Sequence, residues 1–196
     1  MTGDSPTDDE PTVESLSDPE TLRDRDDVAF RDEETVLGPG EYEDVRERVE
    51  RVAGLVLAGV VDDEGRTLLV NREGCSRGWM LPGSVVAPGD DWAAAGRRAV
   101  ERMTGVTVAV HGPAAVRRTV YRPAEGEAVA ESQSTASPDG KHPVSHDVVW
   151  CASPTGGGTL PDAPVVDGDE WDAGWFDDLP QDVDAADEDD VRLFVD

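Results

Sequence analysis

The sequence contains almost no lysine: Lys141 is the only one, and arginine supplies the rest of its 17 basic residues against 44 acidic ones, for a net charge of −27. A chain so poor in positive charge has no basic stripe to displace the counterions of a nucleic-acid backbone, which argues against nucleic acid as a partner. A small phosphorylated ligand is still compatible with this charge, because one local arginine cluster is enough to bind it.

Cysteine is also scarce, since Cys75 and Cys151 are the only two. Two cysteines are too few for a disulfide framework or for a zinc site by themselves. No apolar run approaches the roughly 20 residues that cross a bilayer, and the first residues are acidic where a signal peptide is basic and then apolar. We therefore expect a cytoplasmic protein without a membrane partner.

The acidic excess runs through the middle of the chain as well as its ends, for example at Asp62, Asp90 and Asp169. Such a surface repels itself in dilute buffer, whereas molar salt shortens the Debye length to about 3 Å and screens the repulsion. We interpret the composition as that of a halophilic protein; the alternative is an ordinary protein with two acidic tails.

Apolar spacing divides the chain into four parts. Residues 1–38 hold little apolar material and predict an acidic, disordered arm. Tyr42, Val45, Val49 and Val52 recur at helical spacing, which predicts an amphipathic helix over 39–52. Residues 53–180 alternate strand and helix patterns and form the expected domain, and residues 181–196 form an acidic tail whose Val191, Leu193, Phe194 and Val195 are candidates for a docking turn.

Within the domain, two apolar runs around the turn at Asp62–Gly65 predict a hairpin over 53–72. A helix is expected from Asp91 to about Thr104, with Asp90 as its N-cap and Gly105 as its C-terminal glycine. Further strands are predicted at 106–110, 114–122 and 146–153, and a polar insertion at 123–145 predicts a flexible loop. Strands on both sides of one helix indicate a mixed α/β or α+β sandwich.

Several short motifs follow one another along the chain: LLVNRE, then W-x-L-P-G at 79–83, a Pro-Gly-Asp turn at 88–90, an Ala-rich helix with Arg98, and Gly105. Together with Glu170 and the closing WFDDLP, they resemble the Nudix family, whose members hydrolyse nucleoside diphosphates linked to another group. The resemblance covers 53–180 and implies a Nudix-type sandwich of mixed β-sheet, with the box helix between strands.

The family's box, G-x5-E-x7-R-E-U-x-E-E-x-G-U, falls on residues 84–106 when it is anchored on Gly105. Arg98 keeps the box arginine, while Ser84 and Asp90 replace the first glycine and the first glutamate. The three later glutamates become Ala99, Arg102 and Met103. In an alternative alignment Arg97 is the box arginine. Glu101 then takes one of the glutamate positions, but Gly105 is one residue away from the position of the box glycine.

The lost positions carry the chemistry of the family. Residues i, i+3 and i+4 share one helix face, and three carboxylates there hold Mg²⁺ or Mn²⁺ with the substrate phosphates. A methyl group, a guanidinium and a thioether do not. If the protein is active, its metal ligands must come from Asp90, Glu101 or Glu170. The alternative is that these three are ordinary acidic residues of the surface.

Two functions therefore remain. In the first, the chain is a metal-dependent hydrolase of nucleoside-diphosphate derivatives with weak or absent turnover. In the second, it is a non-catalytic Nudix module with a degenerate active site, which binds a nucleotide-like ligand through Arg98 and Arg102 or binds a protein partner. The alternative to ligand binding is that Arg102 pairs with an acidic neighbour and Arg98 with Asp90. Trp79 and Trp92 flank the box, where they either stack on a base or pack in the core.

Overall fold

The computed structural model describes residues 15–72, 78–124, 142–156, 158–160, 165–166 and 169–195, with the backbone alone at 165, 166, 169 and 170. In chain order its elements are η1 (Pro19–Leu22), β1 (Ala29–Leu37), α1 (Pro39–Val49), β2 (Gly54–Val60), β3 (Thr67–Arg72), β4 (Gly83–Val86), α2 (Trp92–Thr104), β5 (Val108–Pro123), β6 (Val144–Pro154), β7 (Val165–Val166), β8 (Asp169–Phe176) and α3 (Glu188–Val191). Among these residues no helix is long and apolar enough to span a membrane.

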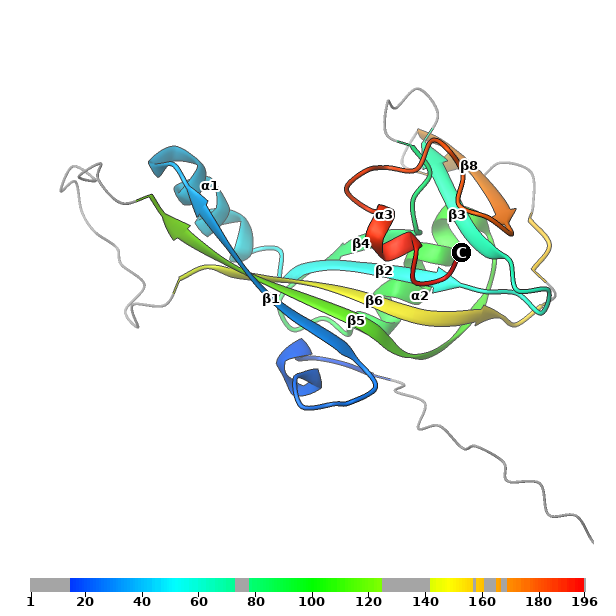
Figure 1. The fold of residues 1–196 in the computed structure, drawn as a ribbon, viewed down its shortest axis with the longest axis horizontal. Coiled ribbons are helices and arrows are strands. Elements are labelled where there is room, and N and C mark those ends of the chain that lie inside the picture. Colours follow the sequence, from blue (N-terminus) through cyan, green and yellow to red (C-terminus); the bar gives the residue numbers. More distant parts are fainter. Residues whose placement is uncertain are drawn as a thin grey trace, which may run out of the picture.

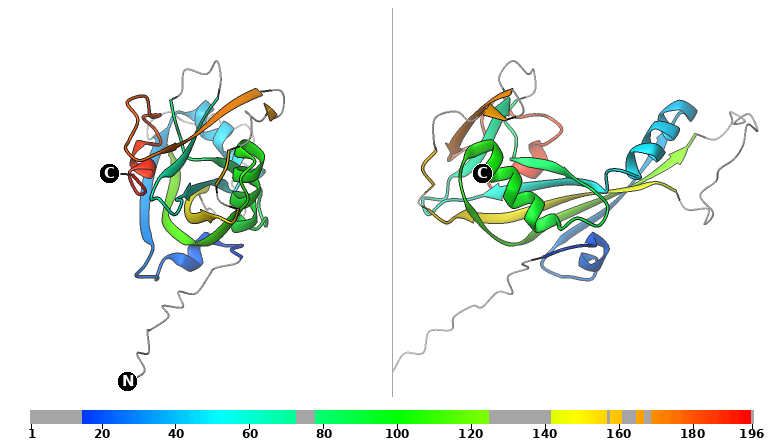
Figure 2. Two further views of the ribbon diagram at one scale, coloured as in Figure 1. Left: turned by 90° about the vertical axis from the view of Figure 1, so that its right-hand side faces the viewer. Right: turned by 180° about the vertical axis from the view of Figure 1, so that it is seen from behind.

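Two sheets make up the fold, in the orders β1-β5-β6-β2-β4 and β3-β8-β7. The larger sheet is mixed: β1 lies parallel to β5, and β2 parallel to β6, whereas β5 and β6 are antiparallel, as are β2 and β4. Helices α2 and α3 lie on opposite faces of this sheet (Figures 1 and 2). The predicted fold class, a mixed α+β sandwich, is confirmed.

The strand β2 is buried on both faces, which explains why the predicted hairpin is wrong. Val56 is packed in the core cluster on the α2 side, and Leu57 in the cluster that contains the C-terminal segment. Both edges of β2 are occupied, by β6 and β4, so β3 has no edge to pair with. The turn at Asp62–Gly65 is present, but only the single bridge Val61–Thr67 joins the two strands before β3 enters the other sheet.

The segment expected to be a disordered arm, residues 1–38, is ordered from residue 15 onward. Leu16, Leu22 and Val28 are buried in the main core, and β1 pairs with β5 over nine residues. Three well-spaced apolar side chains and backbone pairing give order to a stretch that is otherwise polar. Residues 1–14 lie outside the described residues.

The predicted helix at 39–52 is present as α1, which ends at Val49 and has no fully buried residue. It lies against the outer part of the long strands, away from α2 (Figure 1). The strands predicted at 106–110 and 114–122 are one strand, β5, whose register shifts between Val110 and Ala115. Most of the insertion predicted at 123–145, namely residues 125–141, lies outside the described residues.

The expected acidic tail, residues 181–196, docks on the domain. Val191 is fully buried and Val195 nearly so, whereas Leu193 is exposed. The Thr67 hydroxyl donates a hydrogen bond of 2.9 Å to the carbonyl oxygen of Phe194. The Phe194 ring lies over Gly59, where a Cβ atom would come within 2.2 Å of it. The absence of a side chain at position 59 therefore makes room for the docked segment.

We predict that Gly59→Ala lowers the free energy of unfolding by about 1–3 kcal/mol, the usual effect of overpacking, because the methyl group must displace the Phe194 ring. Urea unfolding measures the loss, and hydrogen exchange should rise at residues 191–195. Gly40→Ala is the matched control, since a Cβ atom there meets nothing within 4 Å. An unchanged stability in Gly59→Ala would contradict the packing described for Phe194.

Candidate functional site

The helix α2 has well-defined ends. The Asp91 carboxylate accepts a hydrogen bond of 2.9 Å from the backbone N–H of Ala94, so Asp91 is the N-cap. The prediction of Asp90 as the cap is wrong by one residue: Asp90 closes the preceding turn by donating its N–H to the Ala87 carbonyl. Gly105 ends the helix with φ of +71°, as predicted, because that backbone conformation favours glycine.

An open groove of about 640 Å³ lies between β4 and α2, lined by Ser84, Val85, Ala95, Arg98, Ala99, Glu101 and Arg102. On this lining Ala99 is 1% exposed, while Val85 is 66% exposed. Met103 is buried and is not part of the lining. Of the three positions that would carry carboxylates in the family's box, one is therefore a methyl group, one is core, and only Arg102 presents a charge.

The guanidinium groups of Arg98 and Arg102 are exposed, and neither has a hydrogen bond or an ion pair within the described part of the chain. The pairing of Arg98 with Asp90, and of Arg102 with an acidic neighbour, is therefore absent from the described structure. Most other arginines do hold carboxylates, for example Arg66 with Asp62 at 2.7 Å. In a chain with 44 acidic residues, two unpaired arginines in one groove make a local positive site.

The structure describes the side chains of two of the three metal-ligand candidates, Asp90 and Glu101. Asp90 is exposed in the turn before α2. Glu101 is exposed and lines the groove. The backbone of Glu170 lies on β8, but its side chain is outside the described residues. Among the side chains that are described, no group of three or more His, Cys, Asp and Glu could hold a metal ion.

These donors do not fit Mg²⁺ or Mn²⁺. A hard divalent cation needs several oxygen ligands in octahedral geometry, and the groove lining offers the carboxylate of Glu101 with the Ser84 hydroxyl. The charges of Arg98 and Arg102 on the same lining repel a cation. The described lining of the groove is therefore electrostatically suited to an anion and not to a divalent cation.

Two tryptophans near the box pack rather than line the groove. Trp92 is 2% exposed in the core, and Trp79 meets the Phe176 ring edge-on, with 4.7 Å between ring centroids. Their alternative role in stacking on a base is not supported by these positions. Cys75 lies outside the described residues, and Cys151 is half-buried on β6.

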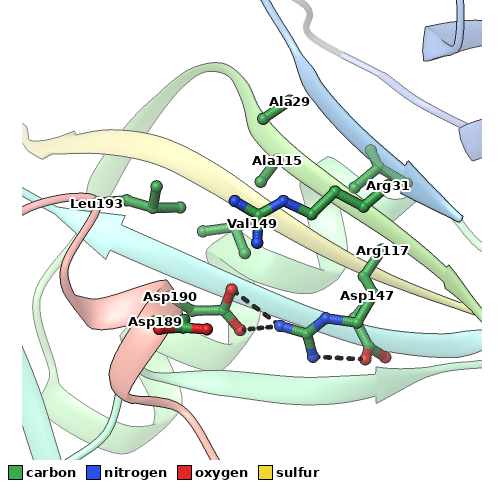
Figure 3. Close-up of a pocket in the computed structure, with 10 residues that line it drawn as sticks. Ala29, Arg31, Ala115, Arg117, Asp147, Val149, Asp189, Asp190 and Leu193 are labelled. Carbon is green, nitrogen blue, oxygen red and sulfur yellow. Dashed lines mark hydrogen bonds and ion pairs between the residues drawn. The ribbon is translucent and has the colours of Figure 1, made fainter. Parts of the chain in front are cut away.

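A second charged site, which no motif of the sequence indicated, is a small cavity of about 30 Å³ between the large sheet and α3 (Figure 3). There Arg117 donates to both carboxylate oxygens of Asp190, at 3.1 and 3.2 Å, and contacts Asp147 at 3.5 Å. Glu33 lies 3.6 Å from the same guanidinium. The sequence signal is weak, because these residues come from four separate segments.

This cluster places three carboxylates around one guanidinium. Burial raises the pKa of Asp147 above its ordinary value of 3.8; the charge of Arg117 lowers it, and that of Asp190 raises it. Asp147 is thus paired with Arg117 on this part of the sheet and does not line the groove between β4 and α2. The arrangement holds α3 on the sheet while it leaves excess negative charge beneath the helix.

We predict that Asp147→Asn stabilises the protein more at pH 7 than near pH 4. A carboxyl group whose folded pKa is raised binds more protons in the folded state, so its contribution to stability falls as the pH rises from 3.8 through the folded pKa. The asparagine removes that loss while Arg117 keeps Asp190. Urea unfolding across this pH range tests the trend, with the exposed Asp63→Asn as control for one lost charge. A pH-independent difference would contradict it.

Comparison with known proteins gives structural similarities at low sequence identity. No family model matches the chain, and no curated protein does. A solved UDP-X diphosphatase is 19% identical with a TM-score of 0.46, covering 78% of this chain and 70% of that one. A NUDIX hydrolase from Nitrosomonas europaea is 16% identical (TM-score 0.43; 74% and 78% covered), and a MutT protein from Methanosarcina mazei Go1 is 18% identical (0.44; 74% and 94%).

Proposed function

We propose that this chain is a Nudix-type domain that binds a small phosphorylated ligand in the groove between β4 and α2 and does not hydrolyse it through a metal on α2. The observation that carries the proposal is that Arg98 and Arg102 are exposed on the groove lining and have no hydrogen bond or ion pair among the described residues. The order of motifs from 79 to 105 supports the family assignment.

The two arginines are four residues apart on one helix, so their Cβ atoms are about 6 Å apart. A guanidinium binds phosphate oxygens through two parallel hydrogen bonds and needs no metal to do so. Adjacent phosphates of a diphosphate can thus each meet one arginine. The net charge of −27 repels larger polyanions, so a small ligand fits better than a nucleic acid.

Loss of hydrolysis follows from the same positions. Metal-bound water and the metal's charge supply most of the rate in a metal-dependent hydrolase. Ala99 and Met103 bring no oxygen to the groove, and Arg102 opposes a cation. The second candidate function, a metal-dependent hydrolase, is favoured by one observation, the exposed carboxylate of Glu101 on the groove lining, which Asp90 and Glu170 would have to assist.

We predict that the protein binds pyrophosphate or ADP-ribose without added metal and that Arg102→Ala weakens the binding about ten- to a hundred-fold, as expected when a charge-assisted bidentate contact is removed. Isothermal titration in molar KCl measures the affinity. Arg48→Ala is the matched control: Arg48 is exposed on α1, has no ion pair among the described residues, and does not line the groove.

The hydrolase is tested with the same proteins. ADP-ribose, diadenosine polyphosphates and nucleoside triphosphates are incubated with Mg²⁺ or Mn²⁺, and product is measured. We expect no turnover. Turnover that disappears in Glu101→Gln or Glu170→Gln would overturn the non-catalytic assignment, whereas equal binding by the wild type, Arg102→Ala and Arg48→Ala would remove the ligand from this groove.

The charge of the chain suits a cytoplasm that holds molar salt. We expect its thermal unfolding midpoint to rise from 0.1 to 2 M KCl, because screening relieves repulsion among 44 acidic residues. Circular dichroism measures the midpoint. Replacing the exposed Asp24, Asp26 and Asp63 by asparagine should reduce the dependence on salt. A midpoint insensitive to KCl would contradict the halophilic interpretation.

A further inference from the structure

The groove has a candidate occupant within the chain itself. Residues 1–14 contain five carboxylates, Asp4, Asp8, Asp9, Glu10 and Glu14, and no lysine, arginine or histidine. We infer that the run Asp8-Asp9-Glu10 docks on Arg98 and Arg102 and competes with an anionic ligand for the groove. The inference shares its groove with the proposed function, and its first readout does not depend on that function.

The chain enters the described structure beside the helix that carries both arginines. The backbone N–H of Trp92 donates a hydrogen bond of 2.9 Å to the carbonyl oxygen of Leu16. The Asp91 carboxylate, which caps the same helix end, is also hydrogen-bonded to the Ser15 side chain. Leu16 is buried in the main core. Residue 15 is thereby fixed at the N-terminus of α2.

The distances are short enough for contact. With a rise of 1.5 Å per residue, Arg98 lies about 9 Å and Arg102 about 15 Å along the helix from Trp92. An extended chain covers about 3.3–3.6 Å per residue, so the five steps from Ser15 back to Glu10 span up to about 17 Å. The chain length therefore allows Asp8, Asp9 and Glu10 to reach both guanidinium groups.

Charge selects this groove over other surfaces. Arg48 and Arg51 are also exposed and without an ion pair in the described ranges. Arg48 belongs to α1 and Arg51 follows it, however, and this part of the chain is rich in carboxylates: Glu41, Glu43, Asp44, Glu47 and Glu50. On the groove lining, two arginines face one carboxylate, that of Glu101. An acidic segment is attracted there and repelled by most of the remaining surface.

The contact is weak and local. Exposed ion pairs contribute little each and are screened by salt, but a tethered segment acts at an effective concentration in the millimolar range. Displacing it should reduce the apparent affinity of a free anion by about two- to ten-fold. The docked segment thus sets a threshold that a ligand with more phosphates overcomes more readily.

The test uses the full chain with Asp8→Asn, Asp9→Asn and Glu10→Gln combined. Its matched control combines Asp24→Asn, Asp26→Asn and Glu47→Gln, which removes the same charge at exposed positions outside the groove lining. The first readout is the Nε–Hε resonances of Arg98 and Arg102 without ligand, at the lowest KCl concentration that keeps the protein folded. The second is pyrophosphate affinity by isothermal titration.

We expect the first variant to shift both arginine resonances and to bind pyrophosphate about two- to ten-fold more tightly, while the control does neither. Unchanged resonances in the first variant, equal effects in both variants, or shifts that depend on protein concentration would each overturn the intrachain contact, the last in favour of a second copy. Shifted resonances without pyrophosphate binding by any protein would uphold the docking and refute the proposed function.

Discussion

The two walls of the groove are held in place by the central strand β2. Gly83 of β4 lies so close that a Cβ atom there would be 2.5 Å from the Val56 carbonyl oxygen, and one at Gly96 of α2 would be 3.2 Å from a Val56 methyl group. Both glycines allow backbone to approach a buried strand, as close packing requires. The separation between Val85 and the arginines of α2 is therefore fixed by contacts of the core and is independent of any ligand.

The second constraint is the pairing of charged side chains across neighbouring strands. Arginines of β5 face carboxylates of the neighbouring strands: Arg117 meets Asp147 of β6, and Arg118 contacts Asp32 of β1 at 3.3 Å. The acidic strand β1 is thus neutralised by β5 where the two pair. Arg98 and Arg102 are excluded from this pattern because β4, the strand opposite them, offers Ser84 and Val85 and no carboxylate. Their freedom is a consequence of which strand lies opposite α2.

Local patterns predicted α2 and its terminal glycine, since these depend on residues within one helix. They failed for β1, because its order depends on backbone pairing with residues 115–123 and on ion pairs to Arg118 and Arg122, more than 80 positions away. The hairpin at 53–72 failed for a similar reason: the turn was visible, while competition from β4 and β6 for the edges of β2 was not. The box positions on α2 were identified from the sequence, whereas the burial of Met103 and the lack of described ion pairs at Arg98 and Arg102 depend on their neighbours in space.

The positive charges of Arg98 and Arg102 oppose the binding of a divalent cation in the same groove. Replacing Met103 by glutamate would bury a carboxylate in the core, where an unpaired charge is strongly unfavourable, and Ala99 is equally enclosed. Replacing Arg102 by a neutral residue would leave the charge of Arg98 in the groove, and Glu101 would still be the only carboxylate on the described lining. No single substitution on α2 therefore converts this groove into a metal site; the packing of the helix and its charge would have to change together. With two arginines beside a buried Ala99 on its described lining, the groove is electrostatically complementary to an anion.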